Sequence, residues 1–270
     1  MRLRWLLPVG FLVGFASPAT GAAARKVLIV CDETPQMEAL AKFLHDEAGY
    51  ETQIVAQEDC PDNLSGYRGV FNFVHSPLTE KVEEALIAYA LAGGRLISLH
   101  HGISSSKMLN KKWLPFCGVA LSRKERDEGG WSVLGNITAE LVNLRPGHYI
   151  TSHRVVYDGT TTYTPSDFPS TEQECPVLRF PRSEVFLNEH FTDGREKTVL
   201  FGVKGNDPET GKLYMQDRGG WFQRKGKGWA FYFQMGHATS DFQNRSYCQI
   251  LLNCLQWDTS QTDDSDAPGK

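Results

Sequence analysis

The chain has 270 residues, of which 41% are hydrophobic and 22% are charged, and it carries 25 glycines and 13 prolines. This composition excludes collagen-like, low-complexity and largely disordered proteins, and it predicts a globular fold. The 28 Lys and Arg residues and 32 Asp and Glu residues give a net charge of −4 with no basic stripe, which argues against a nucleic-acid partner. A chain of this length can build a stable core without metals or disulfides.

Residues 1–24 have the pattern of a secretory signal peptide. Arg2 and Arg4 precede an apolar stretch over residues 5–16, and mostly small residues follow over 17–24. The apolar stretch is shorter than the roughly 20 residues that a membrane-spanning helix needs, so we expect cleavage rather than anchoring. The mature protein is then predicted to be periplasmic or secreted, with no membrane partner. Removing the two arginines would change the net charge from −4 to −6.

Hydrophobic runs and helical periodicities alternate along the first hundred residues. In chain order they predict a strand at 26–31, a helix at 37–48, strands at 51–56 and 69–74, a helix at 79–92 and a strand at 95–99. The strands are nearly continuous in Val, Ile, Leu and Phe, which is typical of strands buried on both faces. We therefore predict one α/β domain over residues 25–257, with a mainly parallel sheet and helices on both faces.

The second half of the chain has a weaker pattern. Residues 104–117 have helical character, and residues 158–176, rich in Thr, Ser and Pro, are expected to cover the surface. The remaining predicted elements are strands at 131–144, 184–188, 198–203, 213–224 and 229–235, and a closing helix at 243–257. The acidic segment 258–270 is predicted to be a disordered tail.

The cysteine pattern argues against a metal ribbon or a redox motif. The chain has six cysteines and no Cys-x-x-Cys. Six cysteines in a chain of this length are far fewer than a disulfide-stapled scaffold contains. We expect Cys31, Cys117 and Cys254 to be buried thiols rather than members of an obligatory disulfide network.

Histidines follow three of the predicted strands at their carboxyl ends, which is where open α/β sheets bind ligands. His75 follows the third strand, His100 and His101 follow the fourth, and His237 follows the last. Because parallel strands end at the same edge, we expect His100 and His237 to share a crevice, with their imidazoles within about 12 Å. An imidazole both takes and gives a proton near neutral pH, so the pair predicts acid/base chemistry, with His75 and His101 at the wall of the site.

The turn after the fourth strand resembles the one that presents the nucleophile in hydrolases, but His100 stands where Ser or Cys would be. This disfavours an acyl-enzyme mechanism of the glutaminase type and favours an acid/base or metal-ligand role. The alternative is a structural histidine that is hydrogen-bonded at a strand end. Glu184 is a third catalytic candidate, because it could orient an imidazole or accept sugar hydroxyls. It could equally pair with a surface cation.

Other polar and aromatic residues are weaker candidates. Four aromatic residues could form a stacking face or belong to the core: Trp131, Tyr149, Trp221 and Phe222. Four imidazoles could hold zinc with an open position: His75, His100, His148 and His237. No His-x-x-x-His pair is present to fix such ligands, so we favour metal-free chemistry and predict no cofactor.

Three segments resemble the trehalose-utilisation, ThuA-like proteins. They are the glycine pair, strand and histidine at 93–101, the acidic-x-aromatic strand at 183–186, and the glycine-framed strand at 226–237, which precedes the closing helix. The resemblance covers residues 26–257 and implies a flavodoxin-like fold similar to class I glutamine amidotransferases, without their cysteine nucleophile. The family's His-Pro-Ile-Thr motif corresponds to residues 148–151, which makes His148 a substrate-binding candidate together with Trp221.

The resemblance also implies a role in carbohydrate metabolism. The family is linked to disaccharide breakdown, including keto-sugar intermediates. We therefore expect a hydrolase or isomerase that acts on a glycoside or keto-sugar by histidine acid/base chemistry, with a small carbohydrate as its partner. The alternative is a non-catalytic carbohydrate-binding module, in which the histidines hydrogen-bond a glycan without turning it over.

Overall fold

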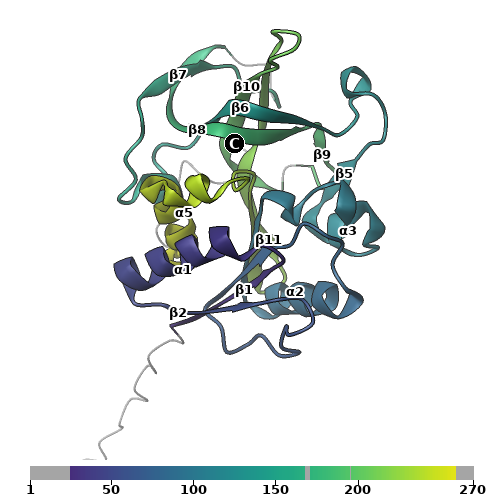
Figure 1. The fold of residues 1–270 in the computed structure, drawn as a ribbon, viewed down its shortest axis with the longest axis vertical. Coiled ribbons are helices and arrows are strands. Elements are labelled where there is room, and N and C mark those ends of the chain that lie inside the picture. The colour runs from purple at the N-terminus through teal and green to yellow at the C-terminus, as the bar shows by residue number, and fades with distance from the viewer. Residues whose placement is uncertain (1–24, 168–170, 195, 260–270) are drawn as a thin grey trace, which may run out of the picture.

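A mixed sheet organises the chain, and within the described residues it has ten strands in the order β2-β1-β3-β4-β12-β11-β10-β6-β8-β7 (Figure 1). The computed structural model describes residues 25–167, 171–194 and 196–259. The predicted signal peptide lies outside these residues, as does the predicted tail apart from its first two residues.

One half of the sheet is parallel and forms the part that carries the strand-end histidines. Its five strands pair in parallel with their neighbours: β2 (Glu51–Val55), β1 (Lys26–Cys31), β3 (Gly69–Phe73), β4 (Arg95–Leu99) and β12 (Gly228–Phe233). Their carboxyl ends consequently lie along one edge of the sheet.

The other half of the sheet is antiparallel, and most of it lies in the upper part of Figure 1. Its strands are β11 (Leu213–Lys225), β10 (Thr198–Asn206), β6 (Ser132–Asn143), β8 (Gln173–Leu187) and β7 (Thr160–Tyr163). A separate small sheet pairs β5 (Val119–Leu121) with β9 (Glu189–Phe191).

Helices cover both faces of the parallel half because its strands are apolar on both sides. On β1, Val27 and Ile29 belong to the core under one pair of helices, whereas Leu28 and Val30 belong to the core on the opposite face. The first core contains the buried faces of α1 (Thr34–Ala48) and α5 (Arg245–Gln256), and the second contains those of α2 (Glu80–Ala92) and α3 (Trp113–Cys117). The described residues include no helix long and apolar enough to cross a membrane.

Local sequence signals set the ends of the longer helices. Pro35 lies in the first turn of α1, and Gly49 ends that helix with a left-handed φ of 66°. The hydroxyl of Thr79 accepts a hydrogen bond from the backbone N–H of Val82 and caps α2. The remaining helical turns are short: α4 (Tyr149–Ser152) and the 3-10 turns η1 (His100–Gly102), η2 (Ser105–Leu109), η3 (Arg126–Glu128) and η4 (Thr239–Gln243).

The α/β prediction is confirmed, and the parallel strands form the core of a mixed sheet. The antiparallel half is more extensive than the sequence predicted. Residues 158–176 contain β7 and the beginning of β8 rather than only surface loop, because β-branched threonines pair well across strands. Residues 104–117 divide into η2 and α3. Glu184 does not begin its strand, since β8 starts at Gln173.

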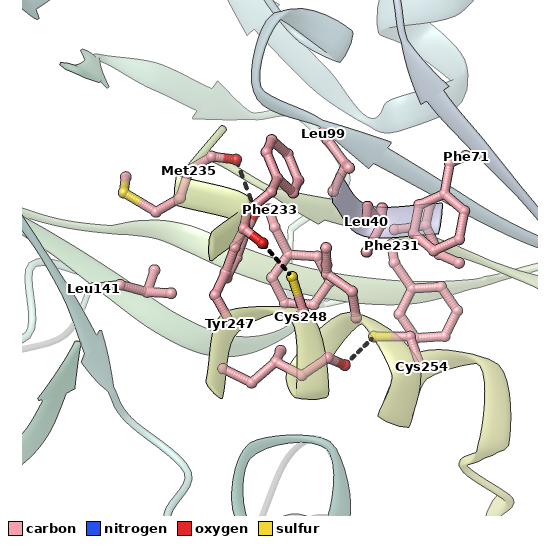
Figure 2. Packing of buried hydrophobic residues seen from close by; sticks show 14 of the residues in the cluster. Leu40, Phe71, Leu99, Leu141, Phe231, Phe233, Met235, Tyr247, Cys248 and Cys254 are labelled. Carbon is pink, nitrogen blue, oxygen red and sulfur yellow. Dashed lines mark hydrogen bonds between the residues drawn. The ribbon is translucent and has the colours of Figure 1, made fainter. Parts of the chain in front are cut away.

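All six cysteines are buried free thiols, as expected for Cys31, Cys117 and Cys254. Figure 2 shows Cys248 and Cys254 on α5, packed among aromatic side chains of the sheet. The same helix holds the end of β12 through a hydrogen bond from the hydroxyl of Tyr247 to the carbonyl of Met235, at 2.7 Å.

Two arginines at the amino ends of the parallel strands hold the last turn of α5. Arg95 donates to the carbonyls of Cys254 at 3.0 Å and Trp257 at 2.6 Å, and Arg68 donates to the carbonyl of Leu255 at 2.9 Å. These bonds satisfy carbonyls that a helix end leaves without partners. A pocket of about 540 Å³ opens beside them, at the edge opposite the strand-end histidines.

We expect Arg95→Met to lower the free energy of unfolding by about 1.5–3 kcal/mol, because it removes two charge-assisted hydrogen bonds but keeps the apolar stem. Denaturant unfolding would measure the loss. Arg123→Met, at an exposed position, is the control and should change stability by less than about 0.5 kcal/mol. Equal stability of the two variants would contradict the role of Arg95.

Candidate active site

The strand-end histidines meet around one carboxylate, that of Glu184 on β8. Its Oε1 lies 3.1 Å from Nε2 of His100 and 3.3 Å from Nε2 of His101, and its Oε2 lies 3.4 Å from Nδ1 of His237. The ring centroid of His75 is 4.5 Å from that of His101. We call these five residues the histidine cluster. The rings of His100 and His237 are 5.8 Å apart, so their predicted proximity is confirmed.

His100 occupies a strained turn directly after β4. Its φ of 47° is left-handed, which is uncommon for a residue with a side chain and is found at functional sites. The side chain is fully buried, with the ring of Phe186 stacked on it at 4.8 Å. Nδ1 lies 2.9 Å from the backbone carbonyl of Gln234, and since a carbonyl only accepts, Nδ1 carries the proton. Burial lowers the pKa of His100 to about 4, so the ring is neutral with Nε2 unprotonated.

Gln234 links the two halves of the sheet at this point. Its side-chain amide donates to the carbonyl of Phe186 and accepts from the N–H of the same residue, both at 3.0 Å. These two bonds fix β8 two residues beyond Glu184, while the backbone carbonyl of Gln234 holds His100. Gln234 thus positions both partners of the His100–Glu184 contact.

Glu184 is largely shielded, with 13% of its side chain exposed. Burial alone would raise the pKa of this carboxyl, but the histidines around it outweigh burial and lower the pKa well below the usual range. The carboxylate is therefore ionised at neutral pH. The adjacent Ser183 donates from its hydroxyl to the carboxylate of Asp241 at 3.0 Å, which fixes this stretch of β8 from the other side.

A glycine allows His237 to approach His100. Gly236 has a φ of 141°, and a Cβ at this position would lie 3.2 Å from Cβ of His100. The position therefore requires glycine on two counts, backbone conformation and space. The carboxylate of Asp241 accepts a hydrogen bond from the backbone N–H of Ala238 at 3.3 Å and holds the loop that carries His237.

His75 is oriented by Asp32, which directly follows β1. The Asp32 carboxylate accepts from the backbone N–H of His75 at 2.8 Å and lies 3.0 Å from its Nδ1. Burial would raise the pKa of Asp32, but the hydrogen bonds from His75 and Ser76 lower it well below the usual range. The buried Lys107 donates to the carbonyls of Val74 at 2.7 Å and Ser76 at 2.8 Å, and so pins the same loop.

Sequence reasoning missed four of these positioning residues: Asp32, Lys107, Gln234 and Asp241. Asp32 carried the same signal as the histidines, since it is a polar residue at the end of an apolar strand. The other three carried none, because each acts on a group that is distant in the sequence: Lys107 and Gln234 on backbone groups, and Asp241 on the hydroxyl of Ser183.

Two predicted substrate-binding residues lie in the interior instead. His148 is 2% exposed, caps α4 by accepting from the N–H of Ile150, and packs against the rings of Phe222 and Trp257. Trp221 is 1% exposed and packs on Tyr232. Both side chains are therefore buried among aromatic groups rather than exposed beside the histidine cluster.

The structure places the other aromatic candidates in different environments. Phe222 is buried in the core, and Tyr149 stacks on His153 at 4.6 Å. Trp131 is partly exposed, and its ring lies 5.4 Å from that of Phe186, which in turn packs on His100. Trp131 is thus the aromatic candidate that the structure places beside the cluster.

A buried carboxyl lies beneath the cluster. The hydroxyl of Tyr232 is 3.1 Å from Oε1 of Glu189 and 3.1 Å from the carbonyl of His100. Burial raises the pKa of Glu189 to about 8 despite the nearby Lys197 and Arg218, so its carboxyl is mainly protonated at neutral pH. The protonated carboxyl donates to Tyr232, and Tyr232 donates to the carbonyl of His100.

Comparison with known proteins assigns the family. The family model for ThuA, described as trehalose utilisation, matches residues 26–258. The chain belongs to the ThuA family. The match confirms the resemblance of residues 26–257, including the three motif segments. No curated protein shows a significant match to the chain.

Solved structures share the fold. A putative ThuA-like protein from Bacteroides uniformis matches with a TM-score of 0.58 at 17% identity, covering 89% of this chain and 94% of its own. A cytoplasmic protein from Salmonella typhimurium matches with a TM-score of 0.53 at 13% identity, covering 86% and 98%. At these identities the likeness extends to the ThuA fold alone.

The buried Glu189 predicts a loss of stability as the pH rises. Its folded-state pKa of about 8 lies above the unfolded value of about 4.3. The stabilisation by the neutral carboxyl is therefore complete below about pH 4.3, and it is lost as the pH rises from there through about pH 8. Glu189→Gln cannot ionise. Denaturant unfolding at about pH 5 and pH 9 should show the native protein losing a few kcal/mol more than this variant.

The surface variant Glu58→Gln is the control and should follow the native protein over the same range. Parallel pH profiles for the native protein and Glu189→Gln would contradict a neutral Glu189.

Proposed function

We propose that this protein is an enzyme of carbohydrate breakdown, a hydrolase or isomerase acting on a glycoside or keto-sugar. Its membership of the trehalose-utilisation family supports a carbohydrate substrate. The observation that carries the proposal is the ring of three imidazoles within 3.1–3.4 Å of the Glu184 carboxylate, at the carboxyl edge of a parallel sheet. Imidazole groups, which can act as general acids or bases, are thereby held within reach of one small molecule.

The members of the cluster differ in their access to a substrate. The side chains of His75, His101 and His237 are 26%, 25% and 45% exposed, whereas that of His100 is fully buried. The three exposed imidazoles are therefore the groups that can touch a sugar. His100 acts through Glu184, which it contacts, and is a positioning residue in this proposal.

Two imidazoles that exchange protons with the substrate suit both isomerisation and hydrolysis. In a keto-sugar, one neutral imidazole removes a proton from the carbon beside the ketone, and a second returns a proton to carbon or to the departing oxygen. His75 is prepared for such a role because Asp32 holds its Nδ1 and leaves Nε2 for exchange. In glycoside hydrolysis the same pair would activate water and protonate the leaving group.

Trp131 supplies a surface for the sugar ring. It is partly exposed and packs against Phe186, the residue that stacks on His100. Aromatic faces bind the apolar face of a pyranose while polar side chains bind its hydroxyls. The arrangement supports a carbohydrate as the occupant of the cluster.

We also propose that the protein works outside the cytoplasm. The support is the signal-peptide pattern of residues 1–24, which lie outside the described residues. The substrate would then be an extracellular or periplasmic sugar.

The test is turnover of non-reducing disaccharides and their keto derivatives by the purified protein, with products separated by chromatography. We expect His75→Ala and His101→Ala to lower kcat by about 10²–10⁴-fold, the range for loss of a general acid or base. Sugar affinity, measured by calorimetry, should change by less than about tenfold.

His45→Ala, an exposed histidine on α1, is the matched control and should retain full activity. A native protein that binds sugars without converting any of them would contradict the proposal and support a binding module. Variants with kcat equal to that of the control would contradict the proposed roles of His75 and His101.

A further inference from the structure

Nε2 of His100 is buried beside Glu184 without a hydrogen-bond partner. Nδ1 of the same ring binds the carbonyl of Gln234, so Nε2 is the nitrogen that remains for a ligand. Nε2 and the carboxylate oxygen of Glu184 are 3.1 Å apart. A buried polar nitrogen without a partner calls for an explanation, and a cation bound by both the nitrogen and the carboxylate provides one.

A third side chain, that of His237, lies close to His100 and Glu184. Nδ1 of His237 lies 3.4 Å from Oε2 of Glu184, and the ligand atoms of His100, Glu184 and His237 all lie within 4.8 Å of one another. A tetrahedral ion with ligands at 2.0–2.1 Å separates those ligands by about 3.3–3.4 Å. Glu184 presents a different oxygen to each imidazole, at 3.1 Å and 3.4 Å, and both contacts are close to the spacing of neighbouring ligands on one ion.

We propose that a divalent transition-metal ion of the zinc type binds to Nε2 of His100, a carboxylate oxygen of Glu184 and Nδ1 of His237. Two imidazoles and one carboxylate form a ligand set that catalytic zinc sites use, with a fourth position left open. The rings of His101 and His75 lie beside these ligands, with His101 4.4 Å from His100 and His75 4.5 Å from His101.

The surroundings of the three ligands support this assignment. Metal-binding histidines usually donate their second nitrogen to a backbone carbonyl or carboxylate, and His100 does so to Gln234. Asp241 holds both of the other ligands in place, because it binds Ser183 beside Glu184 and Ala238 beside His237. The three ligands are thus held by bonds that do not involve the ion, and an apolar ring, Phe186, closes one side.

The sequence has no local residue spacing that indicates the site, because its ligands come from the ends of β4 and β12 and from the interior of β8. The sequence therefore favoured metal-free chemistry. The proposed ion deepens the proposed function, since it belongs to the same site. It would polarise a ketone oxygen or lower the pKa of a bound water. His237 is then a ligand, and proton transfer falls to His75 and His101.

The test is metal binding by the whole chain, purified without an affinity tag and stripped with a chelator. Calorimetric titration with Zn²⁺ alone should give about one equivalent per chain, and Co²⁺ should give the absorption bands of a tetrahedral site. Glu184→Gln and His237→Ala should each weaken Zn²⁺ binding by at least about 100-fold. His237 is exposed and Glu184→Gln is nearly isosteric, so circular dichroism should show both variants folded.

His45→Ala is again the matched control, because it removes an exposed histidine outside the cluster. Native protein that binds no Zn²⁺, or variants that bind it as tightly as the control, would overturn the proposal. Zn²⁺ binding without sugar turnover would uphold the metal site and remove the proposed function. Sugar turnover by protein that binds no metal would uphold the function and remove the metal site.

Discussion

The chemistry of this site depends on one hydrogen bond, from Nδ1 of His100 to the backbone carbonyl of Gln234. It fixes the tautomer of a fully buried imidazole and turns Nε2 toward Glu184. The strained turn at His100 and the glycine at 236 make this contact possible, because the ring must leave β4 abruptly and pass close to the end of β12. Without that bond, the ring could rotate or change tautomer, and the carboxylate would lose its defined partner.

The fold explains why the site contains a carboxylate as well as histidines. The parallel half of the sheet delivers His75, His100 and His101 from the ends of β3 and β4, and His237 from beyond β12. The antiparallel half delivers Glu184 on β8, and the side chain of Gln234 clamps the two halves together. The antiparallel half thus supplies a functional group that the parallel strands do not carry.

Support for the site reaches well beyond the cluster. Tyr247 on α5 holds the carbonyl of Met235, so the closing helix fixes the strand end that leads to His237 (Figure 2). Tyr232 and the buried Glu189 hold the carbonyl of His100 from below. Helix packing and buried polar bonds therefore set the position of the histidine cluster, which is the kind of support that preorganised sites require.

The sequence predicted the parts of the site that follow from local pattern. Histidines at the ends of apolar strands were assigned to one edge because parallel strands end together, and His100 and His237 do meet there. Glu184 was a candidate from the sequence and does lie among these histidines, but it was placed at the start of a strand, because the length of β8 depends on pairing with β6 and β7. Local sequence carries no information on such distant partners.

Two predicted residues lie in the interior for a different physical reason. His148 and Trp221 are residue types that occur both in cores and in sugar sites, and only tertiary packing decides between them. The family motif at 148–151 begins with His148, which caps α4. Gln234 acts through the backbone of β8, and Asp241 acts through the Ser183 hydroxyl on β8 and the backbone of its own loop, so their type and spacing gave no signal.

The tautomer of His100 is the most direct test of this account. Long-range proton–nitrogen correlation NMR distinguishes a protonated from an unprotonated ring nitrogen and can be assigned to His100 by comparison with His100→Asn. In chelator-treated protein near neutral pH, we expect a neutral ring with the proton on Nδ1 and none on Nε2. A proton on Nε2 would contradict the central claim, because Nε2 would then donate to Glu184 and the site would need no cation.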